Sequence, residues 1–273
     1  MKKLFLTLAL LPLLFSCETI PEDNPDYPDP AYLQYAGRLT LNGVTTKAVY
    51  TPGRLVSIEL TESGIYAIGR YADELGTIAY TAGAYTVSGH DYRLSGFGTI
   101  SFNNSQEGFV ELTIKPDEGY QQLVWATLKK ADSSNKAYRA WNVEKTRVTV
   151  KGWRTISADF IGCDFKEIAD FLRANGHKAP VDVPDHGIRS ISLTGTETMI
   201  IAYDDGSADL NEFSLNGNVI KYTWSDNMKG FTFETEKAVI SYMDGKCILT
   251  INGKIRDSST SGSVTFMMSP YNP

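Results

Sequence analysis

The chain has 273 residues, with 26 lysines and arginines against 32 aspartates and glutamates, and a formal net charge of -6 at pH 7. The basic residues form no run, so the sequence lacks the electrostatic footprint of a nucleic-acid-binding protein. The length is sufficient for one large β domain or for two of ordinary size.

Residues 1–16 have the features of a secretory signal peptide. Lys2 and Lys3 supply the positive start, and an apolar run extends from Leu4 to Phe15. As a helix this run would rise roughly 18 Å, which is short of the roughly 30 Å hydrocarbon core of a bilayer. We therefore expect the segment to be removed and not to cross the membrane.

The residues Leu14-Phe15-Ser16-Cys17 stand where a small-residue cleavage site is expected. They resemble the lipobox of bacterial lipoproteins, in which the cysteine is acylated and becomes the first residue. Phe15 departs from that pattern, because a smaller residue is commoner at its position. The resemblance implies that Cys17 carries several acyl chains, which are sufficient for stable membrane anchoring. The alternative is an ordinary secreted chain in which Cys17 has no such role.

Residues 17–31 are predicted to form an extended, hydrated tether, because acids and prolines dominate and little apolar surface is present. Acids close behind a lipidated cysteine also resemble the surface-export signal of Bacteroidetes lipoproteins. We therefore predict an outer-membrane lipoprotein of the cell envelope that faces either the periplasm or the outside. The acids and prolines are Glu18, Pro21, Glu22, Asp23, Pro25, Asp26, Pro28, Asp29 and Pro30.

From residue 32 onward, apolar and polar residues alternate with a period of two, and glycine turns interrupt the alternation. Asn-Gly or Asp-Gly pairs at 42–43, 205–206, 216–217 and 244–245 accept the positive φ angles of hairpin turns, and 62–64 is a further turn. Aromatic and β-branched residues fill the flanks, as strands prefer. The pattern predicts an all-β, mainly antiparallel fold.

One segment has helical periodicity instead. Asp164 is a candidate N-cap, with Glu167 at the capping-box spacing. Apolar residues from Phe165 to Leu172 share one face, and Gly176 is suited to end the helix. We predict one amphipathic helix near 164–175, packed on a sheet.

The two halves of the chain resemble each other. Residues 57–68 are similar to 190–203, residues 84–94 to 212–224, and residues 110–114 to 247–251. These matches indicate a duplication, although β-hairpins also resemble one another without common origin. We predict an N-terminal β module at 32–150 and a C-terminal module with the helix at 151–273. Each would have six to nine strands, as a barrel or a sandwich.

The lipobox, the acidic tether and the segments GFGTISF, ADFIGCDFKEIADFL and YDDGSAD together resemble the uncharacterised lipoproteins of gut Bacteroidales. Some members of that group have calycin-like or lipocalin-like β barrels, so the resemblance implies barrel modules here. The group has no activity that carries over, and no catalytic residue transfers.

Two cysteines remain after Cys17. Cys163 and Cys247 form an even pair in an exported chain, where a disulfide is permitted. The alternative is two buried thiols, since free cysteine is often buried as a small hydrophobe. Cys163 precedes the helix N-cap, where a thiol pKa can be lowered, but its apolar neighbours favour a structural role.

The sequence contains no cofactor motif, and its candidates for metal binding are weak. Asp204, Asp205 and Asp209 crowd around a glycine and could begin a calcium site, but a hairpin turn already explains Asp205. The three histidines show no metal-ligand spacing, and no nucleophile elbow is present. The three histidines are His90, His177 and His186.

Aromatic residues give the main indication of ligand binding, because tyrosine and tryptophan suit interfaces and sugar-stacking platforms. The alternative for the same residues is packing within the sheet. The candidate ligand face consists of Tyr66, Tyr80, Tyr85, Tyr92, Trp125 and Trp141.

We therefore predict a non-catalytic, lipid-anchored envelope protein. Its ligand would be a glycan or peptide on an aromatic face, or a small apolar molecule inside a barrel; a scaffold role is the remaining version. The alternative is a polysaccharide hydrolase with paired carboxylates at the module junction, one with a raised pKa.

Overall fold

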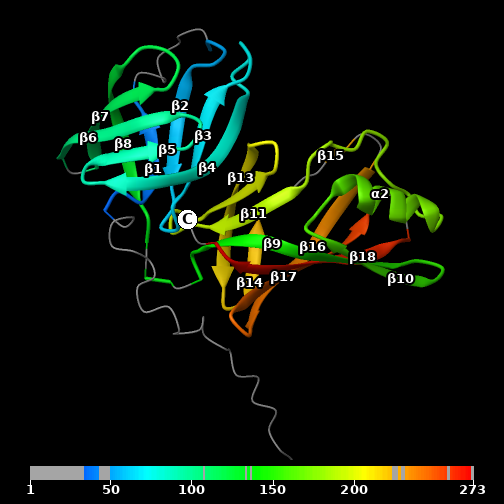
Figure 1. Ribbon diagram of the computed structural model, residues 1–273. Coiled ribbons are helices and arrows are strands. Elements are labelled where there is room, and N and C mark those ends of the chain that lie inside the picture. The colour runs from blue at the N-terminus through cyan, green and yellow to red at the C-terminus, as the bar shows by residue number, and fades with distance from the viewer. Residues whose placement is uncertain are drawn as a thin grey trace, which may run out of the picture.

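The computed structural model describes residues 34–42, 50–106, 108–132, 134–135, 137–222, 227–228, 231–256 and 259–271. The predicted signal peptide, the predicted lipidation site Cys17 and the tether lie outside these residues. Within them, eighteen strands pair antiparallel and one helix is present, which confirms the predicted all-β class. Figure 1 shows two β bodies side by side, with the helix over the second.

Eight strands form the first body, which we call barrel 1. Each strand pairs with the next along the chain. β1 pairs with both β2 and β8, so that Leu39 lies opposite Ile58 on one side and Leu128 on the other, and the barrel is closed. The strands are β1 (Gly37–Leu41), β2 (Leu55–Leu60), β3 (Ile65–Tyr71), β4 (Ile78–Ser88), β5 (Asp91–Leu94), β6 (Gly98–Gln106), β7 (Phe109–Pro116) and β8 (Gln122–Lys130).

The second body, barrel 2, closes through a second cycle of pairings. β9 pairs with β11 at one edge and with β18 at the other, and the intervening strands join these two. β10 (Thr155–Ile161) extends the β11 edge of β9, and β15 (Asn227–Met228) pairs with the start of β16. The strands of the cycle are β9 (Ala140–Lys151), β11 (Ile188–Leu193), β12 (Thr198–Tyr203), β13 (Ser207–Asn216), β14 (Val219–Tyr222), β16 (Phe231–Met243), β17 (Lys246–Ile255) and β18 (Ser261–Pro270).

These pairings correct the predicted division of the chain at residue 150. β9 pairs along most of its length with β18, and therefore belongs to barrel 2. The boundary lies between the end of β8 at Lys130 and the start of β9 at Ala140. The sequence did not reveal this earlier boundary, because β9 alternates between apolar and polar residues as regularly as the strands of barrel 1 do.

The hairpin turns are where glycine was expected to permit them. Gly64, Gly206, Gly217 and Gly245 all have positive φ, between 59° and 85°. Such φ angles cost glycine little and let the strands reverse with their native twist. The fifth predicted turn, at 42–43, lies partly outside the described residues.

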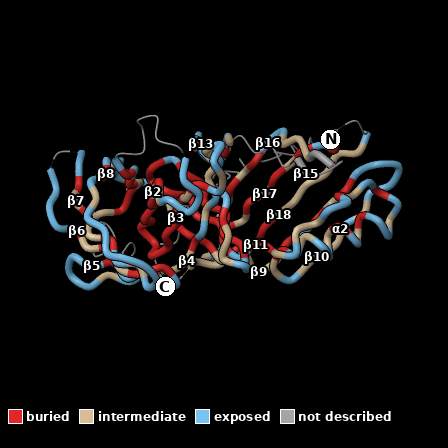
Figure 2. Tube along the Cα trace, turned by 90° about the horizontal axis from the view of Figure 1, so that it is seen from above, coloured by how far each residue is buried: buried red, intermediate tan, exposed pale blue. Residues whose placement is uncertain are grey.

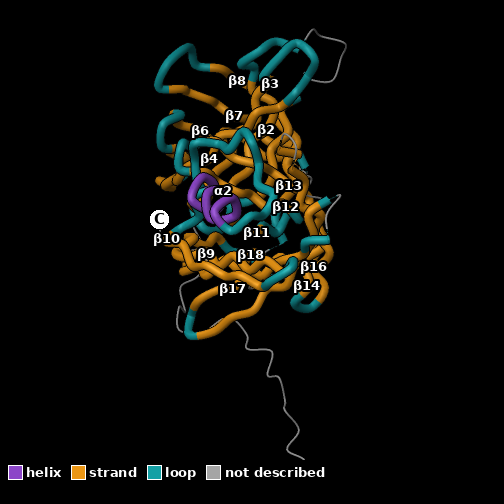
Figure 3. Tube along the Cα trace, turned by 90° about the vertical axis from the view of Figure 1, so that its right-hand side faces the viewer, coloured by secondary structure: helices purple, strands orange, loops and turns teal. Residues whose placement is uncertain are grey.

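The helix α2 (Phe165–Ala174) matches its prediction closely. The Asp164 carboxylate accepts hydrogen bonds from the backbone N–H groups of Lys166 and Glu167, which satisfies two free donors of the first turn. Gly176, with φ 74°, follows the helix end. Figure 3 views the molecule from the right-hand side of Figure 1 and shows α2 in front of the strands of barrel 2.

The two barrels have the same strand order, apart from β15 and the insertion that holds β10 and α2. Under this correspondence β2 and β3 match β11 and β12, β4 and β5 match β13 and β14, and β7 matches β17. The three similar pairs of segments in the sequence fall on these same strands. Shared topology and shared sequence at the same places favour duplication over chance resemblance of hairpins.

The barrels meet through equivalent strands. β4 pairs with β13, and Tyr80 lies opposite Ala208. Beside this pair, small side chains of the outer surfaces form a buried cluster that includes Ala67, Ala82 and Ala202. Small residues let two sheets approach closely, so the junction is packed and not merely linked. Figure 2 shows buried residues running through both bodies and the region between them.

Candidate functional site

The interior of barrel 1 is filled by large side chains. Tyr85, Tyr92 and Ile100 are among its fully buried residues. The Tyr85 hydroxyl donates to the Thr61 carbonyl at 2.6 Å, which satisfies its polar end inside the core. Barrel 1 is therefore packed as a solid core.

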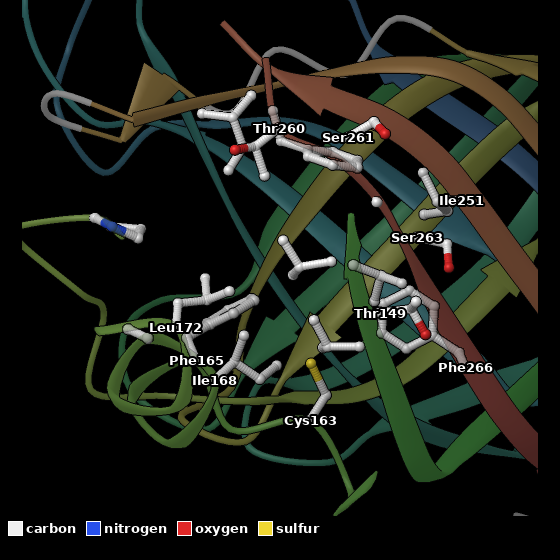
Figure 4. A pocket seen from close by; sticks show the side chains of 18 of the residues that line it. Thr149, Cys163, Phe165, Ile168, Leu172, Ile251, Thr260, Ser261, Ser263 and Phe266 are labelled. Carbon is white, nitrogen blue, oxygen red and sulfur yellow. The ribbon is translucent and has the colours of Figure 1, made fainter. Parts of the chain in front are cut away.

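Barrel 2 contains a cavity of about 140 Å³ beneath α2. Its wall consists of residues of β9, β11, β16, β17 and β18, together with residues of the helix and of the segments beside it. Figure 4 shows Phe165, Ile168 and Leu172 projecting from α2 toward the strand side that carries Ile251 and Phe266. The surface that lines the cavity is almost entirely apolar, although Thr149, Thr260, Ser261 and Ser263 border it, so the cavity suits an apolar molecule.

α2 is fixed over this cavity at both ends. Before the helix, Asp164 forms a β-bridge with Gly187. After it, the guanidinium of Arg154, between β9 and β10, donates to the Asn175 side chain at 3.1 Å, while the His177 backbone N–H caps the Leu172 carbonyl at 2.9 Å and closes the helix end. The helix is thus a defined part of the cavity wall.

Cys163 lines the cavity as a free, buried thiol. Burial raises the pKa of this thiol to about 11, so it is neutral and weakly nucleophilic at neutral pH. Cys247 is also free and buried, and burial raises its pKa as well. The candidate disulfide between them is not present: Cys163 lies directly before α2, whereas Cys247 is the second residue of β17, opposite Tyr242 of β16.

The predicted aromatic ligand face is wrong as a surface. Tyr66, Tyr85, Tyr92 and Trp141 are between 0% and 4% exposed, and their rings belong to the two barrel cores. Alternation along a strand shows which residues share a face but not which face is inside, and these four residues point inward.

The other two predicted residues lie apart from each other. Trp125 is 42% exposed on β8 of barrel 1. Tyr80 on β4 is partly exposed at the junction with barrel 2. The structure therefore brings no two of the six residues together on an exposed face.

A groove of about 430 Å³ lies at the junction of the barrels. Tyr80 borders it from barrel 1, and Phe165, His186, Tyr203 and Asp209 border it from barrel 2. In the sequence, Asp209 and His186 are separate candidate residues. Nothing in the local sequence indicates that α2, the loop before β11 and the three strands β4, β12 and β13 meet at this groove.

The three aspartates of the YDDGSAD segment have separate partners. Asp204 accepts from the Gly187 N–H, Asp205 from Ser207, and Asp209 from the Tyr203 hydroxyl at 2.6 Å. Over the described ranges, no group of three or more histidine, cysteine, aspartate or glutamate side chains could hold a metal ion. The segment functions as a turn with an acidic border.

The three histidines are widely separated. His90 is exposed at the β4–β5 turn, as expected for a residue beside a glycine turn. His177 is buried after α2. His186 lies 3.2 Å from Asp205 and borders the junction groove.

A pair of glutamates lies at the barrel junction. Glu59 accepts from Arg38 Nε at 2.8 Å and from the Thr196 hydroxyl. Burial raises the pKa of Glu62 to about 7, with a smaller contribution from the negative charge of Glu59. A raised carboxyl pKa is what the hydrolase alternative requires, but the two residues are 1% and 2% exposed. A polymer substrate cannot contact this pair in the structure described.

Comparison of the chain with protein-family models and with curated proteins gave no match. In the part of the chain that the structure describes, no helix is both long and apolar enough to cross a membrane.

Proposed function

We propose that the protein is a lipid-anchored component of the bacterial cell envelope that binds a small apolar molecule in barrel 2, beneath α2. The cavity of barrel 2 is the observation that supports this proposal. The lipobox at Cys17 and the acidic tether support the envelope location, and the resemblance to Bacteroidales lipoproteins supports the same setting. The protein would bind and hold its ligand without chemical turnover.

The volume of the cavity limits the ligand. Apolar cavities of roughly 150 Å³ stay dry and bind benzene. The cavity here, of about 140 Å³, is of that size. An aromatic ring or a short alkyl chain would therefore fit, while a full-length fatty acid would need α2 to move.

Barrel 1 would serve as the support of the binding module. Its interior is filled, and β1 begins at Gly37, close behind the predicted tether. The packed junction then fixes barrel 2 relative to barrel 1. This arrangement would hold the binding site at a defined distance from the anchored end.

Titration of benzene and 1-hexanol into the chain from residue 18 onward tests the proposal, since that chain contains every described element. The readout is the chemical shifts of methyl groups that line the cavity, with 1,6-hexanediol as a polar control. We expect shifts at Ile168, Leu172 and Ile251 with the two apolar probes and none with the diol. Absence of shifts at these residues with both apolar probes would contradict the proposal.

A pair of matched variants locates the effect. Ala169→Leu adds three carbons at a buried position that lines the cavity, and should weaken benzene binding at least tenfold. Ala174→Leu makes the same change on the exposed side of the same helix and should leave binding unchanged. Equal binding by both variants would place the ligand elsewhere.

A further inference from the structure

Three rings form one wall of the junction groove. The ring centroids of His186 and Tyr203 are 4.5 Å apart, with planes inclined by 37°. Phe165 lies edge-on to His186 at 6.1 Å and tilted against Tyr203 at 6.2 Å. The rings come from α2, from the loop before β11 and from β12, so their grouping is a product of the fold. Tyr80 of barrel 1 borders the same space.

The charged border of the groove is acidic. Asp209 is exposed, and one of its oxygens accepts from the Tyr203 hydroxyl at 2.6 Å, which fixes the carboxylate beside the ring. Asp205 lies just outside, 3.2 Å from His186. Hydrogen bonds from Ser207, with a smaller contribution from His186, lower the pKa of Asp205, so this carboxylate is ionised at neutral pH. Of the described residues that border the groove, none is a lysine or arginine.

Aromatic faces beside fixed carboxylates attract organic cations. An ammonium group gains from the negative face of each ring within about 6 Å of its centroid, most strongly where water is partly excluded. A metal ion would instead require six or more oxygen ligands in the case of calcium. A neutral sugar could lie on the rings and donate hydroxyl hydrogen bonds to the Asp209 carboxylate, but only a cation also gains from the negative charge of the acidic border. The combination therefore favours a positively charged organic group.

We propose that the junction groove, bordered by Tyr80, Phe165, His186, Tyr203 and Asp209, binds a quaternary ammonium or similar organic cation. The groove, at about 430 Å³, is large enough for choline. This site is separate from the apolar cavity of barrel 2. Phe165 is the one residue that lines both spaces among the described residues that border them.

The direct test compares choline with 3,3-dimethylbutan-1-ol, its uncharged isostere, by calorimetry and ligand-detected NMR on the chain from residue 18. We expect choline to bind at least tenfold more tightly than the isostere, and to weaken as salt is added. Equal affinities would show that charge is not recognised and would overturn the proposal. Preferential binding of methyl glucoside would also overturn it, in favour of a sugar site.

Variants then assign the binding to this groove. Asp209→Asn keeps an oxygen that can accept from Tyr203, so it should fold normally and yet lower choline affinity at least fivefold. Tyr80→Leu should lower it similarly. Glu118→Gln removes a carboxylate from the exposed β7–β8 loop of barrel 1 and should have no effect. Unchanged affinity in both groove variants would overturn the site, and benzene binding in barrel 2 should persist in all three.

Discussion

Tyr80 of β4 and Ala208 of β13 lie opposite each other in the strand pair that joins the two barrels. The similar segments 84–94 and 212–224 begin at an offset of 128 residues, which places Tyr85 on Phe213. The same offset, extended back along β4 and β13, places Tyr80 on Ala208. Each residue therefore faces its own counterpart, which is the relationship that a two-fold axis produces in a symmetric dimer. The two halves of this chain meet as two identical subunits would, with one peptide linker between them.

The equivalence of the two halves also appears in the β2–β3 and β11–β12 turns. The Tyr85 N–H donates to the Gly64 carbonyl at 2.7 Å, and the equivalent Phe213 N–H donates to the Glu197 carbonyl at 3.0 Å. Gly64 has φ 76° and Glu197 has φ 63°. One conformation is thus kept in both halves, although only one half has glycine there.

This difference gives a prediction about stability. A side chain in the left-handed region costs about 1 kcal/mol relative to glycine. Glu197→Gly should therefore raise the free energy of unfolding by up to about 1 kcal/mol, measured by urea denaturation, whereas Gly64→Ala should lower it by a similar amount. Destabilisation by Glu197→Gly would show that the Glu197 side chain makes a compensating contact.

The packed junction predicts that the barrels unfold together. Ala67 is 1% exposed in the cluster between them. Ala67→Glu would bury an unpaired carboxylate and should cost about 3 kcal/mol or more. Calorimetry should then show one transition for the native protein and two for this variant. Ala72→Glu, at an exposed position directly after β3, is the control, and a single unchanged transition for Ala67→Glu would contradict a packed junction.

The raised pKa of Glu62 predicts that the stability of the fold depends on pH. Burial raises its folded-state pKa from 4.5 to about 7, so between these pH values the folded chain retains a proton that the unfolded chain has released. Stability should fall as pH rises through this window, by roughly 3 kcal/mol, and then level off. Glu62→Gln should remove this slope and be more stable than the native protein at pH 8. The measurement is urea denaturation from pH 4 to 8, with Glu118→Gln as an exposed control whose slope should persist.

The hydrogen bonds that cap α2 at Asp164 should limit the access of small reagents to the cavity beneath the helix. Asp164→Ala removes the side-chain acceptor of two backbone N–H groups and should cost about 1 kcal/mol. Because α2 covers Cys163, its thiol should react faster with a neutral labelling reagent in this variant. Asp170→Ala changes an exposed residue of the same helix and should not accelerate labelling. In the unreduced chain from residue 18, denaturation should release two thiols, and none would contradict the free state of both cysteines.

The sequence predicted the local features of the fold well. Alternation and glycine turns located the strands, and Asp164, Glu167 and Gly176 bounded the helix. These signals depend on residues close together in the chain. The repeat was also visible, because equivalent hairpins kept similar residues.

What the sequence missed depends on distant contacts. Closure of barrel 1 determines that Tyr85 and Tyr92 point inward. The alternation of residues along a strand does not show which face of the strand becomes the interior. The cavity arises because α2 covers strands from the far end of the chain, and the junction groove joins Tyr80 to Tyr203. The spacing of neighbouring residues in the sequence does not encode any of these contacts between distant segments.

The central claim is that barrel 2 holds a small apolar molecule beneath α2. A crystal structure of the protein soaked in benzene tests it most directly. We expect density for the ring between Ile168 of the helix and Phe266 of β18, with barrel 1 unoccupied. An empty cavity at saturating benzene, or side chains of α2 found to fill that space, would contradict the account.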